Sequence, residues 1–353
     1  MPDYDAFLLV SFGGPEGPAD VMPFLENVTR GRGVPRERLA EVAHHYRLFG
    51  GMSPINRHCR DLLAAVEKDF AAARVDLPLY WGNRNWHPHL ADTVARMTAD
   101  GVRHAVAFVT SAYGSFSGCR QYLDDIGAAR AKAGPDAPRI DKIRHFYDHP
   151  GFIEPFADAT LAAIGSLPPG VKHDAPLVFT AHSVPEAMAA ASGPAGGLYQ
   201  AQLSEAARLV AGLVSQAEGR ERDWRLVYQS RSGPPSVRWL GPDVRDHLAG
   251  LARAGARGAV LVPVGFVSDH MEVVYDLDID AAETAGRLGM ALARAATPGA
   301  HPRFVSMITE LVRERMGGQA AGGTAGAMRP SRDLCHNGCC RVSAAAARAG
   351  TAT

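Results

Sequence analysis

Short runs of apolar residues alternate along the chain with longer amphipathic stretches. The apolar runs have the length of buried strands and cover residues 6–12, 78–82, 104–110, 140–146, 176–181, 224–229 and 259–264. The amphipathic stretches have helical spacing and cover residues 19–28, 35–46, 56–73, 89–99, 118–133, 151–163, 197–217, 242–254 and 270–285. Strands that are apolar throughout, separated by helices of this length, are typical of parallel sheets covered on both faces. The pattern therefore predicts an α/β protein.

The alternation of strands and helices occurs twice. One series begins at Ala6 and the other at Pro176, with a joint near residues 147–175. We expect two Rossmann-like, doubly wound lobes with a cleft between them, one over residues 1–150 and one over residues 151–300. A terminal helix within residues 301–316 is expected to pack on the body. Residues 317–353 are expected to form a linker and a cysteine-bearing tail.

Doubly wound sheets bind ligands outside the carboxyl ends of their strands. Three of the expected strands end in polar or glycine-containing turns, at residues 11–15, 180–185 and 263–270. None of these turns contains the GxGxxG or GxxxxGK[ST] pattern, so they give no specific signal for a nucleotide.

Composition narrows the range of partners. The chain carries 37 basic and 37 acidic side chains, so nothing favours nucleic acid as a partner. The N-terminus lacks the basic region of a signal peptide, and no apolar run approaches the roughly 20 residues of a membrane span. Five cysteines is an odd number, unlike a disulfide framework. We expect a cytoplasmic protein, because clustered thiols in a reducing compartment usually bind metal or carry redox chemistry.

Acidic side chains crowd the start of one expected helix. Glu272, Asp276 and Asp280 are four residues apart, so they would stack along one helical face. An acidic start that favours the helix dipole is the structural alternative, but that effect fades after the first turn. His182 follows an apolar strand, where it could equally be a hydrogen-bonded histidine at a strand end. An acid ladder leading toward a histidine would form a path for a hard divalent cation or for protons.

Five segments of the chain match a known family. They are Phe12-Gly13-Gly14-Pro15, Gly50-Gly51-Met52-Ser53-Pro54-Ile55, Ala181-His182-Ser183-Val184-Pro185, Trp239-Leu240-Gly241-Pro242-Asp243 and PVGFVSDHMEVVYD over residues 263–276. These segments resemble the signature sequences of ferrochelatases, and the resemblance covers residues 6–315 in order. It implies two Rossmann-like lobes around a porphyrin cleft. It also implies a lyase of haem and porphyrin biosynthesis that inserts Fe(II) into a porphyrin and releases two protons.

The resemblance also implies roles for individual residues. His182 and Glu272 would be the paired metal and proton residues across the porphyrin plane, and Asp276 and Asp280 would extend the iron path outward. A neutral imidazole can accept a proton or ligate iron, and carboxylates can replace the water around a metal ion. Which of the pair takes the protons is open. The positions expected to bind the porphyrin are Phe12, Arg30, Tyr46, Ser53 and Tyr122.

The tail holds three of the five cysteines. Cys335, Cys339 and Cys340 follow a stretch, residues 317–327, that is too poor in large apolar residues to fold alone, so a bound metal would have to supply the folding free energy. Cys119 falls in the segment where cluster-bearing ferrochelatases place their internal cysteine. Four thiolates could hold a [2Fe–2S] cluster, but structural zinc has the same ligand count. His336 is an alternative ligand, and Cys59 is expected to be a plain buried thiol.

Two further segments suggest a branch of the family. FLENVTRGR at residues 24–32 and WGNRNW at residues 81–86 resemble actinobacterial-type enzymes, whose substrate is expected to be coproporphyrin III. The product would then pass to a downstream coproheme-processing enzyme. A protoporphyrin IX ferrochelatase, or a chelatase that loads cobalt or nickel into another tetrapyrrole, is the alternative within enzymes. A tetrapyrrole carrier or an iron–sulfur sensor is the alternative of a different class, although a carrier needs no acid ladder.

Overall fold

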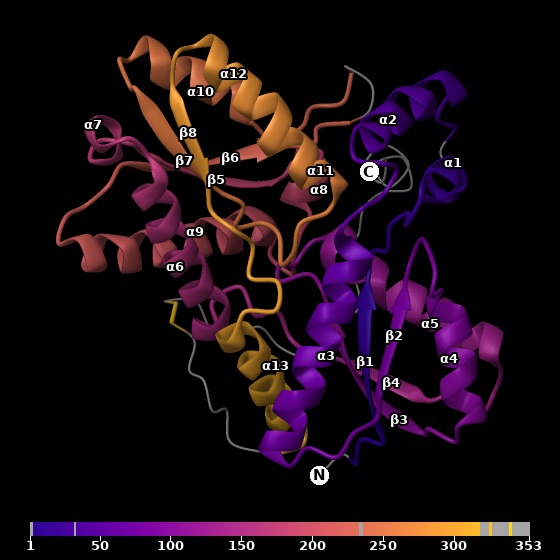
Figure 1. Cartoon of the computed structure of the whole chain (residues 1–353). Helices are drawn as coiled ribbons and strands as arrows, with labels where there is room; N and C mark the ends of the chain where they lie inside the picture. Colours follow the sequence, from indigo (N-terminus) through magenta and orange to yellow (C-terminus); the bar gives the residue numbers. More distant parts are fainter. Residues whose placement is uncertain (1–2, 32, 233–235, 318–324, 327–338, 341–353) are drawn as a thin grey trace.

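Two parallel sheets of four strands each form the framework of the protein (Figure 1). The computed structural model describes residues 3–31, 33–232, 236–317, 325–326 and 339–340. The strand orders are β2-β1-β3-β4 and β6-β5-β7-β8, which are the same order when each series is counted from its own start. The expected α/β fold with two parallel lobes is therefore confirmed. The strands are β1 Ala6–Ser11, β2 Leu79–Asn83, β3 His104–Val109, β4 Arg139–Lys142, β5 Leu177–His182, β6 Trp224–Gln229, β7 Gly258–Val262 and β8 Ala291–Arg294.

Helices cover both faces of the first sheet. On one face, α4 (Leu90–Ala99) and α5 (Gln121–Ala133) share an apolar cluster with β1 and β3. The other face is covered by α3 (Ile55–Ala73), whose buried residues recur at helical spacing. The last helix, α13 (Pro302–Arg315), lies against α3 and contributes to the same core (Figure 1).

The second sheet is covered in the same manner. One face packs against α6 (Pro150–Ser166) and α9 (Leu198–Glu218), and the other packs against α10 (Val244–Arg253) and α12 (Ala282–Arg287). The remaining helices of this half are short: α7 (Pro169–Lys172), α8 (Glu186–Ala190) and α11 (Met271–Val273).

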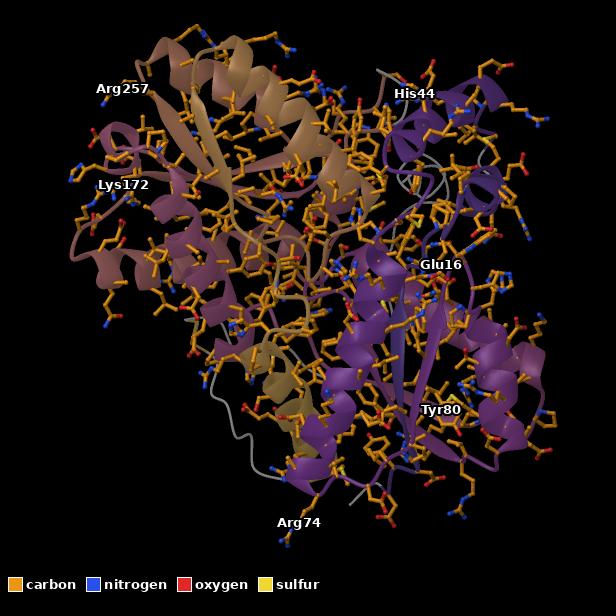
Figure 2. All side chains as sticks on the ribbon, in the orientation of Figure 1. Glu16, His44, Arg74, Tyr80, Lys172 and Arg257 are labelled. Atoms are coloured by element: carbon orange, nitrogen blue, oxygen red, sulfur yellow. The ribbon has the colours of Figure 1, made fainter. Side chains whose placement is uncertain are left out.

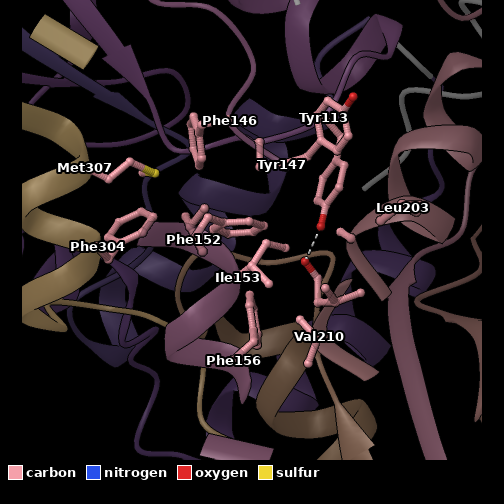
Figure 3. Packing of buried hydrophobic residues seen from close by; sticks show 14 of the residues in the cluster. Tyr113, Phe146, Tyr147, Phe152, Ile153, Phe156, Leu203, Val210, Phe304 and Met307 are labelled. Carbon is pink, nitrogen blue, oxygen red and sulfur yellow. Dashed lines mark hydrogen bonds between the residues drawn. The ribbon is translucent and has the colours of Figure 1, made fainter. Parts of the chain in front are cut away.

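The core is continuous between the two sheets. Phe108 of β3 stacks on Phe146 with ring centroids 4.9 Å apart, and the edge of Phe304 from α13 meets Phe108 at 6.1 Å. Phe152 of α6 packs edge-on against Phe146 at 5.5 Å (Figure 3). Each such ring contributes about 1.5–3 kcal/mol when it is buried. A single apolar cluster thus runs from one sheet to the other, and the lobe boundary expected at residue 150 stays a prediction.

Two helices, α1 (Val21–Val28) and α2 (Arg36–Leu48), form a cap beside the second lobe. A 3-10 turn, Pro18–Asp20, leads into α1. The cap has its own apolar cluster, which includes Phe24, Leu25 and Tyr46 and extends to Met271 of α11. Figure 1 shows α2 on the side of α11, with α1 beyond it, and α1 also contacts the segment after β2 through Asn27 and Asn85. The cap therefore bridges the two lobes.

Some elements differ from the expected ones. β8 has only four half-buried residues in an Ala-rich segment, so its sequence carried no strand signal. The strand expected over residues 140–146 leaves the sheet after Lys142, because Ile143 and Phe146 enter the core between the lobes instead. Two helices contain π-helical turns, Phe116–Arg120 and Val274–Ala281, which apolar periodicity did not reveal.

The outer surface is polar. Arg74, Lys172 and Arg257 lie exposed at the periphery of the molecule (Figure 2). Within the described residues, no helix combines the length and apolar character that crossing a membrane would require.

Candidate active site

A cavity of 930 Å³ opens between the two lobes. Its walls include the carboxyl end of β5, at His182, and the turns that follow β1, β3 and β7, at Phe12, Thr110 and Gly265. β1 and β3 are neighbours at the centre of the first sheet, and β5 and β7 are neighbours at the centre of the second. The strand that follows each of them in the chain lies on its outer side. The carboxyl ends of such strands are where doubly wound folds bind their ligands. The cavity thus lies at the carboxyl ends of the strands of both sheets, where a ligand is expected.

One wall of the cavity is apolar and comes from the cap. The residues that α1, α2 and the segment between them place there are mostly large and aliphatic or aromatic, namely Phe24, Leu25, Val28, Val34, Leu39, Val42 and Tyr46. Phe24 meets Phe12 and Tyr46 edge-on, with centroids 6.4 and 6.0 Å apart. An apolar wall with a few polar groups is suited to a flat, largely apolar ligand.

The turn after β1 depends on its two glycines. Gly13 has φ of +82°, and a side chain there would meet Asn83 at 2.8 Å. At Gly14, an added Cβ would lie 2.7 Å from the Cβ of Ser53. Glycine at both positions lets the chain turn sharply and lets the loop that carries Ser53 approach closely. The segment 12–15 therefore brings Phe12 and Ser53 to the same cavity.

Four of the five residues expected to bind porphyrin line this cavity: Phe12, Tyr46, Ser53 and Tyr122. Arg30 lies elsewhere. It lines a separate cavity of 420 Å³ together with Asn27, His89 and Lys132. Arg84 lines both cavities, so the two are adjacent.

His182 and Glu272 face each other in the cleft. The Nε2 atom of His182 lies 3.4 Å from Oε2 of Glu272, and the two side chains keep 20% and 37% of their surface exposed. Burial lowers the pKa of His182, but the Glu272 carboxylate and the Ser183 carbonyl outweigh burial, so the net pKa is raised. Burial raises the pKa of Glu272, but the hydrogen bond and charge of His182 outweigh it, so the net pKa is lowered. The two side chains therefore stabilise each other's charged forms, the protonated imidazole and the ionised carboxylate.

The acid ladder begins at Glu272 in α11 and continues through Asp276 and Asp280 on the π-helical turn. Asp276 accepts hydrogen bonds from Ser230 and from Nε2 of Gln229, the latter at 3.3 Å. Burial, with repulsion from Glu272, raises the pKa of Asp276 to about 6 despite the bond from Ser230. Asp280 lies farther out, where Arg245 is 3.5 Å away. Asp276 therefore binds a proton more readily than Glu272 does. The π-helical turn that carries Asp276 is of a kind common at functional sites.

Several cavity residues were missed by the sequence analysis. Arg84 lies with its guanidinium 4.5 Å above the ring of Tyr122 and pairs with Asp125. Its position directly after β2 was the signal that could have identified it. Tyr113, Tyr199 and Arg231 also line the cavity. Tyr199 belongs to α9, far from any strand end, so no local pattern marks it.

The described cysteines lie in three places: Cys59 in α3, Cys119 on the π-helical turn before α5, and Cys339 with Cys340 in the tail. Cys339 and Cys340 have their sulfur atoms 3.8 Å apart, and Cys340 is 3% exposed. Two thiolates on one tetrahedral metal with metal–sulfur bonds of about 2.3 Å would be about 3.7 Å apart, so the separation fits shared ligation. Cys59 is buried inside α3, as expected. Cys335 and His336 lie outside the described residues.

A short series of neighbouring residues connects Cys119 of the first lobe with Cys340 of the tail. Cys119 contacts the ring of His145. A Cβ on Gly114 would touch both His145 and Leu198, at 2.9 and 2.7 Å, and Leu198 in turn packs on Gly193. The backbone N–H of Gly193 donates to Sγ of Cys340 at 3.2 Å. In the described part of the chain, however, no group of three or more His, Cys, Asp or Glu side chains is arranged to hold a metal ion.

The chain is similar to several named bacterial proteins. A coproporphyrin III ferrochelatase of Streptomyces griseus subsp. griseus is 52% identical over 96% of this chain and 93% of that protein. One of Nocardia farcinica is 57% identical over 90% of this chain and 89% of that protein. A ferrochelatase of Rhodopirellula baltica is 50% identical over 96% and 94%.

Solved structures and a family model agree with the fold. The structure of SirB from Bacillus subtilis with Fe³⁺ matches 89% of this chain and 98% of that chain, with a TM-score of 0.52 and 11% identity, which supports the fold alone. The model of the ferrochelatase family matches residues 4–316, nearly all of the two lobes and α13. On this match, and on relatives at least half identical over most of its length, the chain belongs to the ferrochelatase family.

Proposed function

We propose that this protein is a coproporphyrin III ferrochelatase, a lyase that inserts Fe(II) into coproporphyrin III and releases two protons. The observation that carries the proposal is the His182–Glu272 pair, 3.4 Å apart on the wall of a 930 Å³ cavity. The names of the relatives from Streptomyces griseus and Nocardia farcinica support coproporphyrin III as the substrate.

The pair offers a route for the two pyrrole protons. Glu272 faces the cavity as a carboxylate, so it is available to accept a proton, and His182 can receive one once its own has left. Asp276, with its pKa of about 6, is the next acceptor on the same helix. Asp280, nearer the surface, would pass protons to water. The same carboxylates can replace the hydration shell of incoming Fe(II), in the reverse direction.

The polar groups of the cleft suit a substrate with four carboxylates. Arg38, Arg84 and Arg231 line the cavity, and Arg30 lines the adjacent cavity. A buried carboxylate without a partner is far more costly than a misplaced vinyl or methyl group. Coproporphyrin III has four propionates and protoporphyrin IX has two, so these cations favour the former.

We also propose that Cys119, Cys335, Cys339 and Cys340 hold a [2Fe–2S] cluster. The 3.8 Å separation of Cys339 and Cys340 and the proximity of the Cys119 and Cys340 segments support this assignment. Zinc would suit the same thiolates, so metal analysis distinguishes the two. A cluster would join the tail to the first lobe through Cys119 and supply folding free energy to the tail.

The charge of the proposed product bears on the compartment of the enzyme and on its downstream partner. A product that keeps four propionates is strongly charged and would be handed over in water, so we propose a cytoplasmic enzyme that feeds a coproheme-processing enzyme in haem biosynthesis. The exposed side chains of Leu48 and Met52, at and just after the end of α2, are available for such a contact.

Anaerobic turnover tests the proposal. The purified protein is supplied with Fe(II) and either coproporphyrin III or protoporphyrin IX, and metalloporphyrin formation is followed by absorption. We expect a higher kcat/KM with coproporphyrin III. Equal or better efficiency with protoporphyrin IX, with and without detergent, would refute the substrate while leaving the chelatase activity in place.

A further inference from the structure

The turn between α8 and α9 lies between the cysteine tail and the catalytic histidine. Ser192 is fully buried in this turn, and Gly193 has φ of +75°. The N–H of Leu198 donates to the carbonyl of Ser192 at 3.1 Å, which closes the turn onto the start of α9. A side chain at Gly193 would meet the Cβ of Leu198 at 2.6 Å. The turn is thus closely packed and has little room to rearrange.

One end of the turn is held by the tail. The N–H of Gly193 donates to Sγ of Cys340 at 3.2 Å, a contact between residues 147 positions apart. Cys340 is almost completely buried, so the contact is shielded from water. A backbone N–H bonds more strongly to a thiolate or a metal-bound sulfur than to a neutral thiol, because the acceptor carries charge. The strength of this hydrogen bond therefore depends on whether the sulfur of Cys340 is a neutral thiol, a thiolate or bound to a metal.

The other end of the turn reaches His182. The Oγ of Ser192 accepts the N–H of Tyr199 at 2.9 Å, and the hydroxyl of Tyr199 donates to the carbonyl of His182, also at 2.9 Å. The ring of His182 is held from the other side by the carbonyl of Ser183. Tyr199 also lines the main cavity. A continuous set of buried contacts therefore links Cys340 to His182 through Gly193, Ser192 and Tyr199.

We propose that Tyr199 is a positioning residue for His182, and that the cysteine tail holds Tyr199 in place through the Ser192–Gly193 turn. This inference rests on the proposed function, because it assigns significance to the orientation of His182 toward the porphyrin. It gives the tail a role in catalysis without any contact between the tail and the substrate. Loss of the sulfur contact would free the turn, then Tyr199, and then the peptide that sets the direction of the His182 ring.

Hydrogen exchange measured by mass spectrometry tests the coupling directly, without reference to activity. In the full-length Cys340→Ser protein, peptides covering residues 182–199 should exchange at least fivefold faster than in the wild type. Peptides covering β7 should be unchanged. Because Cys340→Ser would also disturb any metal held by the tail, Ser192→Ala provides a second variant that leaves all cysteines intact. It should give the same faster exchange around residues 182–183.

Kinetics then test the positioning role. Tyr199→Phe should lower kcat about tenfold and change the KM for porphyrin by less than twofold, and Ser192→Ala should do the same. Tyr80→Phe is the control, because Tyr80 is a buried tyrosine of β2 whose hydroxyl donates to Asp100 at 2.8 Å and which does not line the cavity. It should leave kcat unchanged. The double variant Cys340→Ser/Tyr199→Phe should be no slower than the slower single variant, because both act through one set of contacts.

Two results would overturn the inference. One is unchanged exchange of residues 182–199 in both Cys340→Ser and Ser192→Ala. The other is full multiplication of the kinetic effects of Cys340→Ser and Tyr199→Phe. Failure of the proposed function would look different, since the wild-type protein itself would then not insert Fe(II), whatever the exchange data show.

Discussion

The imidazole of His45 stacks on the ring of Tyr275, with ring centroids 3.8 Å apart and an angle of 9° between the planes. Burial lowers the pKa of His45, so the stacked ring is neutral at pH 7. His45 belongs to α2 of the cap, and Tyr275 lies between Glu272 and Asp276 on the π-helical turn. The contact joins a wall of the porphyrin cavity to the helix that carries the acid ladder.

Removing this stack should loosen the cap. An aromatic pair contributes about 0.5–1.5 kcal/mol, so His45→Ala should increase hydrogen exchange in α2 by about 2- to 10-fold. His45→Phe keeps a ring and should exchange like the wild type. His44→Ala is the control, because His44 is the exposed neighbour on the same helix. Equal exchange in His45→Ala and His44→Ala would show that the stack does not hold the cap.

The buried carboxylate of Asp276 should lower the free energy of unfolding at neutral pH. Its pKa is raised to about 6, so the folded protein binds the proton more tightly than the unfolded chain does, and stability falls as pH rises from about 4 to about 6. Asp276→Asn should therefore be more stable than the wild type above pH 6, by up to about 3 kcal/mol, and should show no such gain at pH 4. Urea unfolding at several pH values measures this difference.

The exposed residue Asp278 provides the control for that experiment. Asp278 belongs to the same helix and pairs with Arg294 at 2.6 Å. Asp278→Asn should give no gain that grows with pH. A pH-independent difference between wild type and Asp276→Asn would contradict the raised pKa. The same Asp276→Asn variant should insert iron slowly, because the acceptor beyond Glu272 is gone.

Arg30 should contribute to substrate preference from the second cavity. Arg84 lines both cavities, so we expect a propionate at the edge of the macrocycle to extend toward Arg30. Arg30→Ala should raise the KM for coproporphyrin III about tenfold more than the KM for protoporphyrin IX, because one charge-assisted contact is lost. Arg36→Ala, an exposed change at the start of α2, should alter neither value. An unchanged preference in Arg30→Ala would remove Arg30 from the substrate site.

The cysteine assignment predicts a spectroscopic pattern. Cys119→Ser, Cys335→Ser and Cys340→Ser should each bleach the visible absorption of a [2Fe–2S] centre in anaerobically purified protein. Cys59→Ser should keep it, because Cys59 is buried in α3, where burial raises the pKa of its thiol to about 11. A colourless wild-type protein with stoichiometric zinc would replace the cluster with a structural zinc site.

The fold was largely predictable because its signals are local. Continuous apolar strands and amphipathic helices repeat twice, and the two sheets follow that repetition. β8 escaped prediction because four half-buried residues, Ala-Leu-Ala-Arg, look the same in a helix. The π-helical turn escaped because acids four residues apart lie on one face of either helix type. Only the backbone hydrogen bonds distinguish the two.

The site was predictable where it lies at strand ends and carries a motif. His182 and Glu272, 90 positions apart, do lie together, as the resemblance implied. Their roles stay predictions. Tyr199 could not be found, because its role depends on a hydrogen bond to the His182 carbonyl that no sequence pattern encodes. Arg30 lines the neighbouring cavity together with residues of α4 and α5, a tertiary relationship that its own loop does not specify.

The pairing of His182 with Glu272 is central to the proposed iron insertion. The direct test is anaerobic iron insertion by His182→Ala and Glu272→Gln, measured together with porphyrin binding by quenching of protein fluorescence. We predict that each variant loses at least a thousandfold in kcat while its porphyrin affinity changes by less than threefold. Near-normal iron insertion in either variant would contradict the claim that this pair performs the chemistry.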